Sequence, residues 1–190
     1  RVKRAIMLAA DGDGAFLSAG DVVGTAGAVS VRADADNGGT SCGALTLANA
    51  TGIKACRGTI ALLADENITV GQVTTTNTSA TAVTLTTREG GIIDGGDTGG
   101  VDVIAGGRLV IDAVTGVGTG AALETTVASV DIDNATSGNI EISETNAITV
   151  FKAVPGTAGN MGLAAGGTIT VDNAGGNVIT VLGTGTITLD

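Results

Sequence analysis

Pairs of apolar residues two positions apart recur along the chain at a nearly fixed interval, as in Val83/Leu85 and Ile140/Ile142. Such a pair places two side chains on one face of a short strand. Many strands come as doublets whose first apolar residues are eight or nine positions apart. These doublets begin at positions 45, 60, 83, 101, 121, 140, 161 and 179, so 119 residues separate the second start from the last over six steps. A fixed period close to 20 residues indicates a solenoid.

The fold predicted from this period is an all-β parallel β-helix (β-solenoid) of about ten rungs, with roughly 20 residues in each rung. Val, Ile and Leu fill its interior and Thr covers its outer faces, while Gly and Asn turn the corners. We expect a single domain over 1–190, with less regular rungs over 1–43 and regular rungs over 44–190. An antiparallel sandwich is the alternative, because it also consists of many short strands. A sandwich gives no reason for a 20-residue period.

The composition excludes several classes of function. The 190 residues contain no His, Trp or Tyr, and Phe16 and Phe151 are the only aromatic residues. A Ser-His-Asp triad, a Cys-His pair and aromatic platforms for sugars or bases are therefore excluded. The net charge of −10 argues against nucleic acid as a partner. We expect no enzymatic activity, and no apolar run is long enough for a transmembrane helix.

Two stretches resemble a known type of repeat. Residues 58–73 read GTIALLADENITVGQV, and residues 94–150 read DGGDTGGVDVIAGGRLVIDAVTGVGTGAALETTVASVDIDNATSGNIEISETNAITV. They resemble the filamentous-haemagglutinin-type β-solenoid repeats of large proteins that Gram-negative bacteria secrete or display. This resemblance implies a right-handed parallel β-helix, an extracellular or bacterial cell-surface location, and adhesive or structural work. The chain begins at Arg1 without Met, and we expect a processed product or an excerpt of a longer protein.

Two cysteines, Cys42 and Cys56, each lie just upstream of an expected strand. On successive rungs their side chains could come within disulfide range, and in an exported protein without His a disulfide is favoured over a metal site. The alternative is two free thiols packed as small apolar groups.

Acidic turns are candidates for calcium binding. Asp11 and Asp13 flank one glycine, and Asp94 and Asp97 flank two. Carboxylates beside flexible glycines can bind Ca²⁺, but solvated Asp and Gly are also common in turns. No other cofactor is expected.

The two ends of a β-helix expose unpaired backbone groups, which favour the addition of another strand. We expect the contact residues to include Ile6 and Leu8 at one end and Ile187 and Leu189 at the other. Copies joined head to tail would form an open filament. The function predicted first is therefore a structural extracellular rod that assembles end to end. The alternative is a shaft segment of a giant secreted adhesin that attaches to cells, surfaces or carbohydrate, with a ligand that the sequence does not identify.

Overall fold

The computed structural model describes residues 6–10, 16–18, 22–24, 27–33, 43–48, 51–96, 100–172, 179–181 and 183–190. The strands within these ranges are β1 (Ile6–Ala10), β2 (Phe16–Ser18), β3 (Val22–Gly24), β4 (Val29–Ala33), β5 (Leu45–Leu47), β6 (Gly52–Ala55), β7 (Ile60–Ala64), β8 (Ile68–Val70), β9 (Gln72–Thr75), β10 (Val83–Thr87), β11 (Ile92–Asp94), β12 (Val103–Ala113), β13 (Leu123–Asn134), β14 (Ile140–Glu144), β15 (Ile148–Val154), β16 (Met161–Ala165), β17 (Ile169–Val171) and β18 (Ile187–Leu189). The described residues contain no helix.

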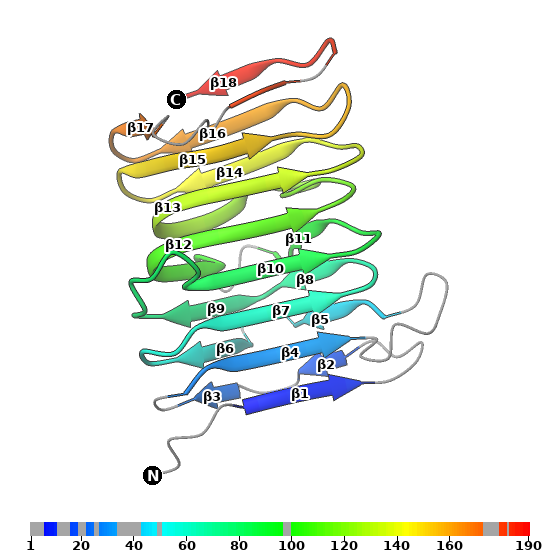
Figure 1. The fold of residues 1–190 in the computed structure, drawn as a ribbon, viewed down its shortest axis with the longest axis vertical. Helices are drawn as coiled ribbons and strands as arrows, with labels where there is room; N and C mark the ends of the chain where they lie inside the picture. Colours follow the sequence, from blue (N-terminus) through cyan, green and yellow to red (C-terminus); the bar gives the residue numbers. More distant parts are fainter. Residues whose placement is uncertain are drawn as a thin grey trace.

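Every pairing between the described strands is parallel. This arrangement confirms the predicted parallel β-solenoid and excludes the sandwich, because adjacent turns of the chain pair with one another (Figure 1). The strands run from β1 at one end of the stack to β18 at the other (Figure 1).

Three stacks of strands surround the core. The first contains β1, β4, β7, β10, β12 and β13, and the second begins with β2, β5, β8 and β11. The third begins with β3, β6 and β9 and then uses the first part of β12. The long strands β12 and β13 bend around a corner, since Val103–Ala105 pairs with β9 whereas the segment from Leu109 pairs with β10. Their mutual register shifts between Ala105 and Arg108, at this corner.

The solenoid has about seven turns of about 22 residues, not the expected ten rungs of roughly 20. Each full turn carries strands from three stacks, and some connections are longer than the regular period allows. Val29 pairs with Ile60, for example, although 31 residues separate them. Near the N-terminus a single turn therefore takes up more residues than the expected 20, which leaves fewer turns in the whole chain than strict periodicity predicts.

Stacked aliphatic side chains form the core. Strands alternate buried and more exposed residues, as in β10 and β14. Parallel register places each inward residue above its counterpart in the previous turn, so the side chains form continuous columns. One fully buried column contains Val29, Ile60, Val83, Leu109 and Val130. Another contains Leu45, Ile68, Ile92, Val117, Ile140 and Met161.

Asparagine side chains connect successive turns at one corner. The amide oxygen of Asn139 accepts a hydrogen bond from the backbone N–H of Asn160 at 2.9 Å, and that of Asn160 accepts from Thr186 N–H at 2.9 Å. Gly138 precedes this ladder with φ of 89°. A Cβ atom there would lie 2.2 Å from the carbonyl oxygen of Thr115, so only glycine fits.

Candidate metal centre

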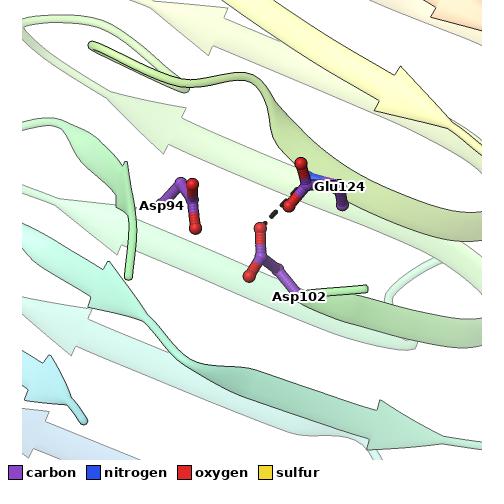
Figure 2. Close-up of side chains that lie close together, drawn as sticks. All are labelled: Asp94, Asp102 and Glu124. Atoms are coloured by element: carbon purple, nitrogen blue, oxygen red, sulfur yellow. Dashed lines mark hydrogen bonds between the residues drawn. The ribbon is translucent and has the colours of Figure 1, made fainter. Parts of the chain in front are cut away.

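Three carboxylates converge where the chain passes from the second stack to the third. Asp94 ends β11, Asp102 directly precedes β12, and Glu124 is the second residue of β13. One oxygen from each of the three groups lies within 4.8 Å of the others. Figure 2 shows the Asp102 carboxyl group directed toward the space between Asp94 and Glu124.

Backbone pairing holds two of these residues in adjacent turns. Val103 pairs with Thr125, and the N–H of Asp102 donates to the carbonyl of Glu124 at 3.1 Å. The 22-residue separation between Asp102 and Glu124 equals about one turn, so the stack brings them together. The backbone N–H of Gly96 donates to Asp94 Oδ1 at 2.7 Å and orients that carboxylate at the end of β11.

Asp102 is the most unusual member of the cluster. It is completely buried, and its Oδ2 accepts a hydrogen bond from the Glu124 backbone N–H at 3.0 Å. Its Oδ1 is buried with no hydrogen-bond partner. Burial raises the pKa of Asp102 to about 8. The hydrogen bond from the Glu124 backbone N–H lowers this pKa, whereas the negative charges of Asp94 and Glu124 raise it.

The ligand chemistry of the cluster suits hard cations, because all three side chains offer oxygen. Calcium and magnesium prefer carboxylate and carbonyl oxygens, whereas zinc and copper sites usually contain His or Cys. Neither Cys nor His belongs to this cluster.

The structure brings one predicted calcium ligand, Asp94, into this group. The other predicted ligands, Asp11, Asp13 and Asp97, lie outside the described residues. The sequence analysis did not predict Asp102 and Glu124 as ligands, because it grouped only carboxylates that lie within a few residues of each other in the sequence. The signal that could have identified them is their separation by one solenoid turn, because equivalent positions in successive turns are neighbours in space.

The predicted disulfide stays a prediction. Cys56 is exposed immediately after β6, while Cys42 lies outside the described residues.

A second buried carboxylate, Glu144 at the end of β14, was also not predicted. It is stacked on Thr125, and its Oε2 accepts hydrogen bonds from Thr125 Oγ1 at 2.8 Å and Val127 N–H at 3.0 Å. Its Oε1 accepts from Asn146 N–H at 3.0 Å. These bonds give both carboxylate oxygens a partner, one set in the core and one at the adjoining corner.

The predicted assembly residues lie on the terminal strands β1 and β18. Ile6 pairs with Val29, and Leu8 is partly buried against the core. Ile187 and Leu189 stack on Met161 and Leu163 of β16 and are exposed.

Comparisons with protein-family models, curated proteins and solved structures find no match to this chain. The parallel β-solenoid is therefore shown by the structure itself, and the filamentous-haemagglutinin resemblance stays a prediction. No helix in the described part of the chain is long and apolar enough to cross a membrane.

Proposed function

We propose that this protein is a structural rod that assembles end to end through its terminal turns. The observation that carries this proposal is a change in the burial of inward-facing residues at the last turn. Ile187 and Leu189 are 46% and 42% exposed, whereas Met161 and Leu163, one turn earlier in the same register, are each 2% exposed. Ile187 and Leu189 continue the inward-facing columns of Met161 and Leu163 and present their apolar surface to solvent in this structure.

The neighbouring stack repeats this difference. Val171 of β17 is 47% exposed, whereas its partner Val150 of β15 is fully buried. Burying apolar surface is favourable in proportion to its area, and an open strand edge also presents unpaired backbone groups. A further solenoid turn would satisfy both requirements.

The occupant that we propose for this surface is the β1 end of a second copy. Strands β1 and β2 form part of the opposite terminal turn: β1 pairs on one side with β4, and β2, which begins the stack that contains β18, pairs on one side with β5. A contact between unlike ends does not close on itself and generates a filament. A filament built from copies of residues 1–190 alone, with about seven turns spaced by about 4.8 Å, would have an axial repeat of about 34 Å.

The experiment compares the wild type with Ile187→Asp/Leu189→Asp and with the control Thr188→Asp. Thr188 lies between the two apolar residues, and its side chain lies on the other face of β18. Sedimentation velocity should detect concentration-dependent association of the wild type and the control, and at least about tenfold weaker association of the double variant. Electron microscopy should show fibres with the predicted repeat.

A monodisperse wild type at high concentration would contradict end-to-end assembly, as would undiminished association of the double variant. A monomer whose natural reading frame adds further repeats after β18 would instead support the adhesin-shaft alternative. Circular dichroism of each variant verifies the β-fold.

We also propose an extracellular or cell-surface location and a non-catalytic role. The sequence resemblance supports the location, and the lack of His, Trp and Tyr supports the absence of enzymatic chemistry. Cleavage of the protein by protease added to intact source cells would support the location, and complete protection with intracellular retention would contradict it.

A further inference from the structure

The separation of the three carboxylates matches the coordination of a single cation. Ca²⁺ binds oxygen ligands at about 2.4 Å, so two oxygens on one ion can be at most about 4.8 Å apart. The chosen oxygens of Asp94, Asp102 and Glu124 satisfy this limit for every pair. The side chains therefore need no large rearrangement to contact one ion.

Asp102 provides an independent indication of a ligand. A fully buried carboxylate with an unpartnered oxygen is costly, because water no longer solvates it and no protein donor replaces the water. Asp102 Oδ1 has these properties, and its carboxyl group is directed into the acidic cluster (Figure 2). A bound cation would satisfy this oxygen and offset the repulsion among the three acids.

We propose that Asp94, Asp102 and Glu124 bind one Ca²⁺ ion between two successive turns of the solenoid. Asp94 and Asp102 contribute from one turn and Glu124 from the next, so the ion connects the turns. Backbone carbonyls or water complete the six to eight oxygen ligands that Ca²⁺ takes. The ion adds a stabilising contact within the rod that does not depend on assembly at the ends.

Hydrogen bonding alone offers a competing explanation. Asp102 in its neutral form could share a proton with Glu124, which would relieve repulsion without a metal. This arrangement predicts that Ca²⁺ has no specific effect. The same side chains therefore give two explanations with opposite expectations in a calcium titration.

The test is isothermal titration calorimetry of the full chain with CaCl₂ after chelator treatment, together with thermal unfolding followed by circular dichroism. We expect one Ca²⁺ per chain with a Kd below about 1 mM, in the range of extracellular calcium modules. Saturating Ca²⁺ should raise the Tm by at least about 2 °C. The variants Asp102→Asn and Glu124→Gln should each bind at least about tenfold more weakly, since even outer-shell changes have effects of this order.

Asp112→Asn is the matched control, because Asp112 is an exposed carboxylate on β12 outside the cluster. It removes the same charge and should leave both Kd and Tm shift unchanged. If Asp102→Asn does not fold, Glu124→Gln and Asp94→Asn give the same measurement at partly exposed positions.

Two outcomes would overturn the calcium site. One is the absence of saturable binding by the wild type up to about 10 mM Ca²⁺, well above the expected Kd. The other is wild-type affinity in the folded cluster variants. Either result leaves the end-to-end proposal unaffected, because that proposal depends on Ile187 and Leu189 instead.

Discussion

Asp102 and Glu144 are both buried carboxylates between turns of the same solenoid, but their surroundings differ. Glu144 accepts hydrogen bonds at both oxygens from Thr125, Val127 and Asn146. Asp102 accepts one from the Glu124 backbone and keeps a buried oxygen without a partner. The comparison shows that burial alone does not define a binding site. A carboxylate whose oxygens are occupied by the protein acts as a structural bridge, whereas one with an open oxygen can accept a ligand.

The largest expected effect follows from removing the satisfied carboxylate. Glu144→Ala leaves the Thr125 hydroxyl and the N–H groups of Val127 and Asn146 without their acceptor. The free energy of unfolding should fall by about 2 kcal/mol or more, because the Thr125 and Val127 donors are buried and each buried polar group that loses its partner costs about 1–3 kcal/mol. Urea unfolding measures the change, and Glu141→Ala, at a less buried position of β14, is the control. A loss below about 1 kcal/mol would contradict a structural role for Glu144.

The opposite sign is expected when the unsatisfied carboxylate is neutralised. In chelator at pH 8, Asp102→Asn should raise the free energy of unfolding by about 1 kcal/mol or more. The Asn oxygen can still accept from Glu124 N–H, while its amide can donate to the nearby carboxylates. A decrease at this pH would show that the Asp102 carboxylate is already well accommodated.

The pH dependence of this difference follows from the raised pKa of Asp102. Below about pH 4, Asp102 is protonated in both folded and unfolded chains, so wild type and variant should differ little. Between pH 4 and the folded pKa of about 8, the unfolded chain releases a proton that the folded chain keeps. The stability of the wild type relative to Asp102→Asn therefore falls as the pH rises across this window. Thermal unfolding in chelator from pH 4 to 8 measures the trend, and a constant difference would contradict it.

Sequence alternation predicted the stacked strands but not the roles of these two acids. Ile140, Ile142 and Glu144 alternate on one strand, so the pattern places Glu144 on the inward face of β14. It does not reveal which donors surround the carboxylate, because those donors come from Thr125 and Val127 one turn earlier and from the following corner. For Asp102 the alternation was misleading: Val101 and Val103 as an inward-facing pair would place Asp102 on the outer face, whereas the chain bends at Asp102 and buries it. The sequence analysis also predicted too many turns, because the apolar periodicity of the strands does not show how many residues an irregular connection contains.

The smallest effect is expected for a carboxylate on the outer surface. The side chain of Asp133 on β13 forms an ion pair with Lys152 on β15, and both side chains are substantially exposed. Asp133→Asn should change the free energy of unfolding by no more than about 0.5 kcal/mol, because water and salt screen an exposed ion pair and its formation restricts both side chains. Urea unfolding at low and high salt measures this change beside those of Glu144→Ala and Asp102→Asn. An effect as large as that of Glu144→Ala would mean that charge, and not hydrogen bonding inside the core, determines how carboxylates act in this solenoid.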